Sequence, residues 1–326
     1  MTIQPRMLPQ ETVEGLRPPL PGYPFFRHAD YFPFRSQVTD YSAINAWWLA
    51  DASFLVYGSS DFILQAFRDS PLPDQGFRID WLGSADDNRG MILSNDSIIA
   101  VVFRGTRLQT HKVFDLAEIV LIDEDDFWTD SQFVPAASRV GGRVHQGFKE
   151  AYNDVCDQLD AVVRAKLPSQ SIWLTGHSLG GALATLAAAH CVEIEMPIQG
   201  IYTYGCPRVG DADFVDRLPR QSHYRFVHRD DWIPTVPPEL LGYTHAGVLK
   251  SVGTATTRKF WEDVAQGLDQ LAASVKSMVR EMRWDMADLP FKVAGLADHA
   301  AVYYATLLWN ELLETREAKT PRLPPD

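Results

Sequence analysis

The chain has 326 residues, of which 46% are hydrophobic and 22% charged, so it can bury the core of one large domain or two ordinary ones. Its formal net charge of -12 argues against binding to nucleic acid and against charge-driven docking on anionic lipid, but leaves uncharged lipid substrates open. The three cysteines, Cys156, Cys191 and Cys206, form no CxxC motif, which argues against zinc and redox sites.

The beginning of the chain, MTIQPRMLPQETVEGLRPPLPGYP, contains no apolar stretch of the kind that a signal peptide needs. No run approaches the roughly 20 apolar residues of a membrane-spanning helix. We therefore expect a cytoplasmic protein without a transmembrane segment.

Residues 1–35 are rich in proline and aromatic residues, and we expect an extended arm on the surface. The prolines that disfavour a regular helix there are Pro5, Pro9, Pro18, Pro19, Pro21, Pro24 and Pro33. The next segment predicts a helix that begins after Thr39 or Asp40 as N-cap and stops at Gly58. Apolar residues recur in it at helical spacing, which predicts packing against the core: Ile44, Trp47, Trp48, Ala52, Leu55 and Val56.

Three strand-like segments follow, at residues 76–84, 90–94 and 97–105. The last two are separated by Asn95-Asp96, a pair that suits a tight hairpin turn. An acidic run at residues 123–126 lacks the ligand spacing and central glycine of a calcium loop, so we expect a solvated loop there.

From residue 146 onward, predicted helices and strands alternate. Helical patterns cover 149–167, 179–194 and 211–218, and strand patterns cover 171–175, 198–205 and 223–228. Such alternation predicts an α/β fold with a mixed, mostly parallel central sheet and helices on both faces, to which the earlier hairpin adds antiparallel strands.

Residues 251–290 carry one apolar seam with polar residues between its members, which predicts a long amphipathic helix. The seam consists of Trp261, Val264, Leu268, Leu271, Val275, Met278 and Met282. It can pack on the body of the protein, cap an active site or face lipid. We expect a single domain over 1–326, with 1–35 as an arm and 251–290 as a helical insertion.

The segment GHSLG, residues 176–180, places Ser178 between a strand pattern and a helix pattern. A serine at such a sharp turn is exposed to substrate, and small flanking residues such as Gly176 and Gly180 leave room for the turn. The amides that open the following helix can stabilise an oxyanion. Ser178 is therefore the candidate nucleophile.

A serine nucleophile needs a histidine base and a carboxylate that orients the histidine. Asp230 and Asp231 follow the strand HYRFVH and are the candidate acids. The histidines considered as the base are His190, His223, His228, His245 and His299. His190 lies within the helix that follows Ser178, and His223 and His228 lie on the strand that precedes Asp230. Spacing alone does not decide between His245 and His299.

Five segments together resemble the class 3 lipase family, typified by filamentous fungal triacylglycerol lipases. They are VVFRGT at 101–106, VHQGF at 144–148, GHSLGGALATLAA at 176–188, YTYGCPRVGD at 202–211 and VHRDDWIPTVPP at 227–238. The resemblance implies an α/β-hydrolase fold and a Ser-His-Asp triad. It selects Asp231 as the acid, three residues before Pro234.

The family pattern also resolves the histidines. Tyr243 to Gly247 match a family segment whose histidine is structural, which makes His245 structural here, and DHAAVYY at 298–304 makes His299 the catalytic base. The resemblance implies an oxyanion hole formed by the amides of Thr106 and Leu179. It makes His145 structural, and we expect His177 to be a packing residue.

The resemblance implies a serine carboxylester hydrolase that acts on acylglycerols or similar lipid esters without a metal or organic cofactor. The alternatives are phospholipase A1 or feruloyl esterase activity on the same scaffold, or a non-catalytic lipid binder. The expected partner is a lipid ester, free or at a lipid–water interface, and not nucleic acid. Fungal members carry a short lid at the position of residues 107–115, where this chain has few strongly apolar residues. A lid can instead be formed by residues 251–290.

Overall fold

The structure is a computed structural model that describes residues 3–16, 18–83, 88–105, 134–219, 222–253, 297–315 and 317–318. Several predicted features therefore lie outside the described residues. They are the acidic run at 123–126, the lid position 107–115, Thr106 of the oxyanion hole, and all but the first three residues of the predicted insertion at 251–290.

A seven-stranded sheet forms the centre of the molecule, in the order β1-β2-β3-β6-β7-β9-β11. The strands are β1 (Arg78–Gly83), β2 (Asn88–Ser94), β3 (Ile98–Phe103), β6 (Ser171–His177), β7 (Gly200–Tyr204), β9 (His223–His228) and β11 (Val248–Val252). Neighbours from β3 to β11 run parallel, whereas β1, β2 and β3 pair antiparallel. The predicted mixed, mostly parallel sheet is confirmed.

The predicted hairpin turn between β2 and β3 is also confirmed. The Asn95 side-chain oxygen accepts hydrogen bonds from the amides of Ser97 and Ile98, at 2.9 and 3.1 Å. Asparagine thus satisfies two amides of the turn that would otherwise need water, which is why it favours such turns.

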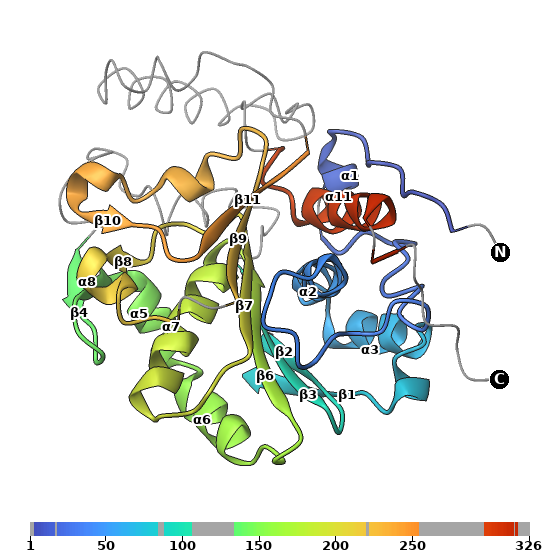
Figure 1. The fold of residues 1–326 in the computed structure, drawn as a ribbon. Coiled ribbons are helices and arrows are strands. Elements are labelled where there is room, and N and C mark those ends of the chain that lie inside the picture. Colours follow the sequence, from blue (N-terminus) through green and yellow to red (C-terminus); the bar gives the residue numbers. More distant parts are fainter. Residues whose placement is uncertain are drawn as a thin grey trace.

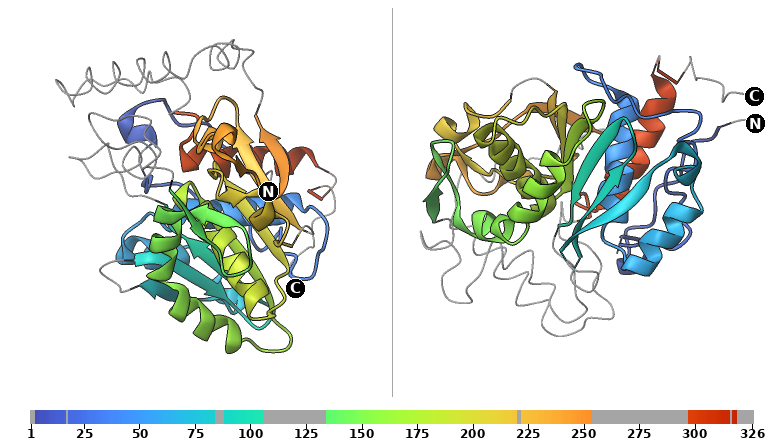
Figure 2. Two further views of the ribbon diagram at one scale, coloured as in Figure 1. Left: turned by 90° about the vertical axis from the view of Figure 1, so that its left-hand side faces the viewer. Right: turned by 90° about the horizontal axis from the view of Figure 1, so that it is seen from below.

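Helices cover both faces of the sheet (Figure 1, and from below in Figure 2). One face carries α2 (Ala43–Leu55), α3 (Ser60–Arg68) and α11 (Ala301–Glu314), with the short α1 (Val13–Leu16) beside α11. The other face carries α5 (Gln146–Asn153), α6 (Cys156–Arg164), α7 (Leu179–Glu193) and α8 (Ala212–Val215). Each face has its own apolar core, so both surfaces of the parallel strands are dry. We propose that the described residues form one domain around this sheet.

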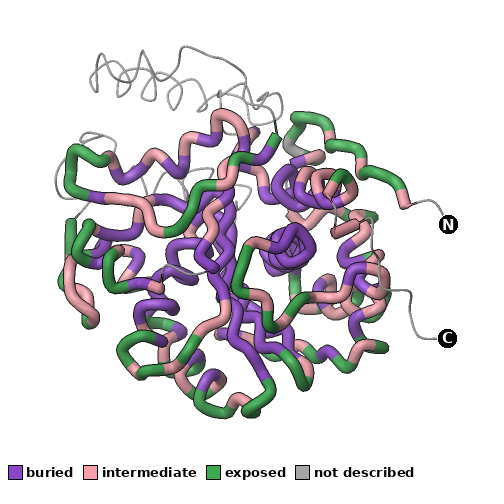
Figure 3. The backbone as a smooth tube through the Cα atoms, viewed as in Figure 1, coloured by how far each residue is buried: buried purple, intermediate pink, exposed green. Residues whose placement is uncertain are grey.

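Helix α2 differs from the prediction at its start. Its N-cap is Ser42, whose side chain accepts a hydrogen bond from the Asn45 amide, and not Thr39 or Asp40. All thirteen of its residues are buried, because the helix lies between the sheet and α11 (Figure 3). The aromatic stripe predicted to pack in the core, including Trp47 and Trp48, does so.

The helix predicted over 149–167 is two helices, α5 and α6. The break falls at Asp154 and Val155, directly after Asn153, and all three are residue types of low helix propensity. A second, four-stranded antiparallel sheet was not predicted, because its strands are only two or three residues long. They are β4 (Pro135–Ala137), β5 (Arg143–His145), β8 (Gly210–Asp211) and β10 (Tyr243–Thr244). Single 3-10 turns lie at Pro73–Gln75, Ile233–Thr235 and Glu239–Leu241.

The arm expected on the surface is anchored inside the molecule. Arg6 forms an ion pair with the fully buried Asp51 of α2 at 2.9 Å, and its guanidinium lies over the rings of Trp47 and Trp309. Asp51 also accepts a hydrogen bond from the Phe26 amide at 2.9 Å. A buried charge is tolerated only when it is paired and hydrogen-bonded, and these contacts fasten the arm to α2 and α11.

Candidate active site

The candidate residues lie where three neighbouring parallel strands end. Strands β6, β7 and β9 end at His177, Tyr204 and His228. Because the carboxyl ends of parallel strands meet at one edge of a sheet, the residues that follow these ends are brought together there. Ser178 directly follows β6, and Asp231 lies three residues beyond β9.

Ser178 forms a strained turn between β6 and α7. Its backbone has φ 59° and ψ -129°, which is uncommon for a residue with a side chain, and it is the N-cap of α7. Gly176 and Gly180 pack backbone to backbone, and a Cβ on either would overlap main-chain atoms. The Ser178 amide donates to Tyr204 O at 2.9 Å. The turn predicted from GHSLG is therefore present.

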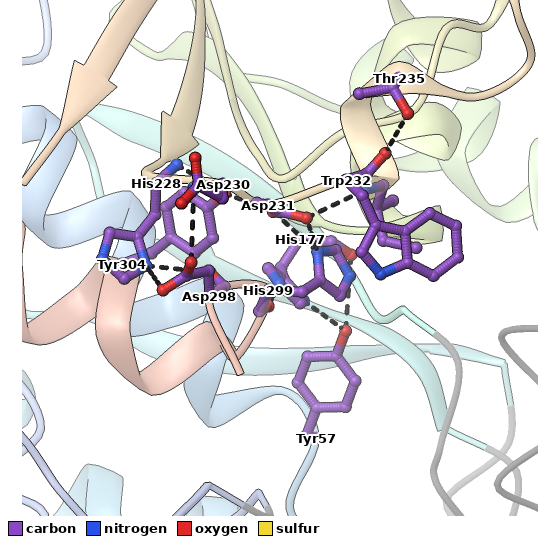
Figure 4. A network of polar contacts seen from close by, with 11 residues as sticks. Tyr57, His177, His228, Asp230, Asp231, Trp232, Thr235, Asp298, His299 and Tyr304 are labelled. Carbon is purple, nitrogen blue, oxygen red and sulfur yellow. Dashed lines mark hydrogen bonds and ion pairs between the residues drawn. The ribbon is translucent and has the colours of Figure 1, made fainter. Parts of the chain in front are cut away.

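His299 and Asp231 are in direct contact (Figure 4). His299 Nδ1 lies 2.8 Å from Asp231 Oδ2 and 3.0 Å from Oδ1, and both side chains are buried. Asp231 also accepts hydrogen bonds from the Ile233 amide at 3.0 Å and from the Tyr304 hydroxyl at 2.6 Å. The carboxylate is satisfied on both oxygens, so it can hold the His299 ring with Nδ1 as the donor.

Gly205 connects the His299–Asp231 pair to the strained turn at Ser178. It follows Tyr204, whose carbonyl binds the Ser178 amide, and it has φ +55°. A Cβ at this position would lie 2.7 Å from Asp231 Oδ2 and 2.9 Å from His299 Nδ1, so only glycine fits.

Ser178 Oγ and His299 Nε2 each lack a hydrogen-bond partner among the residues that the structure describes. They are therefore not hydrogen-bonded to each other here, and such contacts are often long before substrate binds. With Nδ1–H donated to Asp231, the neutral His299 ring keeps the lone pair of Nε2 as a proton acceptor.

Leu179 is the first residue of α7, where backbone amides have no partner within the helix. Its amide is thus available to an anion beside Ser178. The second predicted oxyanion residue, Thr106, lies outside the described residues, but β3 ends at Phe103 and leads to the same edge of the sheet.

The other candidate histidines have different partners. His228 Nδ1 contacts the Asp298 carbonyl at 3.0 Å, and His190 contacts Asp160 at 3.3 Å. His145 caps α5 by accepting from the Phe148 amide, in line with the expected structural role. His245 lies beside Arg225, and burial, followed by that positive charge, lowers its pKa to about 3.

Tyr304 of α11 was missed as a functional candidate in the sequence. Its hydroxyl donates to Asp231 Oδ2 at 2.6 Å and accepts from the His228 amide at 3.0 Å. Burial, followed by the nearby Asp231 charge, raises the Tyr304 pKa well above its usual value, so the hydroxyl keeps its proton. The only signal in the sequence is its position five residues after His299.

Replacing Tyr304 by phenylalanine is expected to lower the free energy of unfolding by about 1–3 kcal/mol, because the buried Asp231 carboxylate loses a donor. Urea unfolding measures this change. Tyr303→Phe is the matched control, since the Tyr303 hydroxyl makes only a 3.3 Å hydrogen bond to Pro9 O. Equal losses in the two variants would show that the Asp231 contact is not stabilising.

The buried His223 and the half-buried His245 predict acid sensitivity. Burial, followed by Arg225, lowers the pKa of His223 to about 4 and that of His245 to about 3, from an unfolded value of 6.5. The unfolded chain therefore binds more protons than the folded one below pH 6.5, and stability falls as the pH drops towards 4.

We expect His223→Gln to reduce this pH dependence by about 1.4 kcal/mol per pH unit at about pH 5, because each such group contributes that slope. Urea unfolding of both proteins at several pH values tests it. The comparison removes the effect of carboxylates, which titrate in both proteins, and parallel stability curves would rule out the assignment to His223.

Among the residues that the structure describes, no cluster of histidine, cysteine or acidic side chains could hold a metal ion. The three cysteines are unpaired. Within the same part of the chain, no helix combines the length and apolar character needed to cross a membrane.

The part of the chain that contains Ser178 and Asp231 is similar to a known protein family. Residues 100–241 match the sequence model of the class 3 lipases. This part of the chain is therefore similar to the class 3 lipases. Among similar proteins, secreted mono- and diacylglycerol lipase 1 of Fusarium solani is 39% identical over 38% of this chain and 35% of its own length. Secreted mono- and diacylglycerol lipase LIP1 of Malassezia globosa is 29% identical over 64% of each chain, and a lipase of Rhizopus niveus is 30% identical over 57% of this chain and 47% of its own.

Solved structures of lipases are also similar to this chain. A triacylglycerol lipase described as having a serine protease triad at its catalytic centre superimposes with a TM-score of 0.50, at 25% identity over 64% of this chain and 79% of its own. Lipase II from Rhizopus niveus also gives a TM-score of 0.50 at 25% identity, over 67% of this chain and 84% of its own. The predicted α/β-hydrolase fold is confirmed. The chain spans about a third to two thirds of the length of the three relatives above.

The expected cytoplasmic location is wrong. The Fusarium solani and Malassezia globosa relatives are named as secreted lipases, which contradicts it. The expectation depended on the beginning of the chain and on the lack of a membrane-spanning run. A chain with two apolar cores can fold without disulfides, so unpaired cysteines do not place it inside the cell.

Proposed function

We propose that this protein is a lipase of the class 3 type, a serine carboxylester hydrolase that acts on acylglycerols, with Ser178, His299 and Asp231 as its catalytic triad. The observation that carries the proposal is the buried His299–Asp231 pair beside the strained Ser178 turn. Ser178 Oγ and His299 Nε2 have no hydrogen-bond partner among the described residues, so both atoms can engage a substrate.

In the proposed reaction, Ser178 Oγ attacks the ester carbonyl while His299 Nε2 takes its proton. Asp231 keeps the His299 ring oriented and stabilises the imidazolium that forms. The amides of Leu179 and Thr106 bind the oxyanion, and one such donor contributes about 3 kcal/mol to lowering the barrier. His299 then protonates the leaving alcohol, and water releases the acyl group by the same path.

The substrate class follows from two features. The mono- and diacylglycerol lipase names of two relatives support partial acylglycerols as substrates. The net charge of -12 disfavours anionic phospholipid. We propose that the enzyme meets these water-insoluble esters at a lipid–water interface, outside the cell.

Hydrolysis rates test this function. The substrates are p-nitrophenyl esters of increasing chain length, emulsions of mono-, di- and triacylglycerol, a phospholipid and a feruloyl ester. Activity on long chains and acylglycerol emulsions supports the proposal. Activity confined to feruloyl or short soluble esters, or none at all, overturns it.

A further inference from the structure

His177 is more than a packing residue, because both of its ring nitrogens are engaged. His177 Nε2 lies 2.6 Å from the carbonyl oxygen of His299, and Nδ1 lies 2.8 Å from the Tyr57 hydroxyl. The His177 and His299 rings lie 4.5 Å apart, and all three side chains are buried. Figure 4 shows Tyr57 and His177 directly beside the His299–Asp231 pair.

These partners fix the protonation of the His177 ring. A carbonyl oxygen only accepts, so the proton of the neutral ring must be on Nε2, and Nδ1 then accepts from the Tyr57 O–H. Burial, followed by the neighbouring His299, lowers the His177 pKa well below its usual value, so the ring stays neutral. The His299 carbonyl thus selects the tautomer of His177, and the Tyr57 hydroxyl stabilises it by donating to Nδ1.

The contact joins the two halves of the proposed reaction. His177 directly precedes Ser178 in the chain, while its side chain holds the main chain of His299. The Tyr57 hydroxyl also lies against the backbone of Gly105, the residue before Thr106. One buried chain of contacts therefore links the turn at Ser178, His299, and Gly105, which precedes Thr106.

We propose that His177, oriented by Tyr57, is a positioning residue that sets the separation between Ser178 Oγ and His299 Nε2. The proposal rests on the proposed ester hydrolysis. Ser178 Oγ and His299 Nε2 are not hydrogen-bonded to each other here, so the surrounding backbone must hold the distance between them. A shift of about 1 Å in such a pair can cost about 100-fold in rate.

Two substitutions separate the functions of the two ring nitrogens. His177→Gln can place an amide donor near the position of Nε2 and keep the bond to His299, whereas His177→Asn reaches only towards Tyr57. We expect kcat to fall by about 10- to 100-fold in His177→Asn, with KM unchanged, and by only a few-fold in His177→Gln. Tyr57→Phe, which removes the donor to Nδ1 and leaves the bond to His299, should fall between them.

The same pair of substitutions at His223 is the control, because His223 is equally buried but begins β9, at the opposite end from Asp231. Thermal unfolding of every variant reports stability. Equal kcat losses in the two His177 variants, or losses that follow unfolding temperature as in the His223 pair, would make His177 merely structural.

A readout without substrate separates this proposal from the proposed function. Proton–nitrogen NMR of histidine-labelled protein should show His177 protonated on Nε2 alone, with no titration from about pH 5 to pH 8. Tyr57→Phe should keep Nε2 protonated, because the His299 carbonyl still requires a donor there. A wild-type His177 protonated on Nδ1, or one that titrates in this range, overturns the positioning assignment. An enzyme without esterase activity but with this tautomer overturns the proposed function alone.

Discussion

Replacing Ser178 by alanine is expected to lower kcat for ester hydrolysis by about 10⁶-fold while leaving the fold intact. The Ser178 hydroxyl has no hydrogen-bond partner among the described residues, so its removal breaks no internal hydrogen bond. Steady-state kinetics and circular dichroism of the purified variant measure both effects.

Ser171→Ala, at the opposite end of β6, provides the control. Its hydroxyl donates to the Ser36 carbonyl at 2.7 Å, so this variant should lose some stability but no activity. If Ser178→Ala kept more than about a hundredth of the wild-type kcat, a loss far smaller than that of a nucleophile, another group would have to be the nucleophile.

Replacing Asp231 by asparagine is the second large expected effect, with a fall in kcat of about 10⁴-fold. The amide can present its NH₂ group to His299 Nδ1, which reverses the direction of the 2.8 Å hydrogen bond and moves the ring proton to Nε2. His299 then has no lone pair facing Ser178, although the shape of the site is unchanged.

Asp230→Asn is a matched control, because Asp230 is the adjacent carboxylate and was the competing candidate acid. The structure brings Asp231, not Asp230, into contact with His299. Kinetics of the two variants at a saturating ester concentration distinguish them. A larger loss in Asp230→Asn than in Asp231→Asn would reverse the assignment.

The elements that frame the site could be predicted because their signals are local. Alternating apolar strands and helical segments predicted the mixed parallel sheet, and a serine between glycines predicted the turn before α7. The contact between Asp231 and His299 spans 68 residues, so no local pattern could give it. Spacing left His245 and His299 open, and only the resemblance to class 3 lipases selected between them.

The features that were missed depend on contacts between distant segments. Tyr304 approaches Asp231 only because α11 packs beside the end of β9, and Tyr57 meets His177 across 120 residues. The ion pair with Asp51 buries Arg6, although a charged side chain usually prefers the surface. In each case tertiary packing determines the environment of the side chain, and such packing cannot be predicted from composition or periodicity.

Reaction with a fluorophosphonate tests the central claim most directly, because the reagent labels a serine only where a base and an oxyanion site activate it. Intact-mass measurement followed by peptide mapping identifies the labelled residue. The account predicts one adduct, on Ser178, lost in Ser178→Ala and formed much more slowly in His299→Ala and Asp231→Asn. An unlabelled Ser178 in folded protein, or labelling at the same rate in His299→Ala, would contradict it.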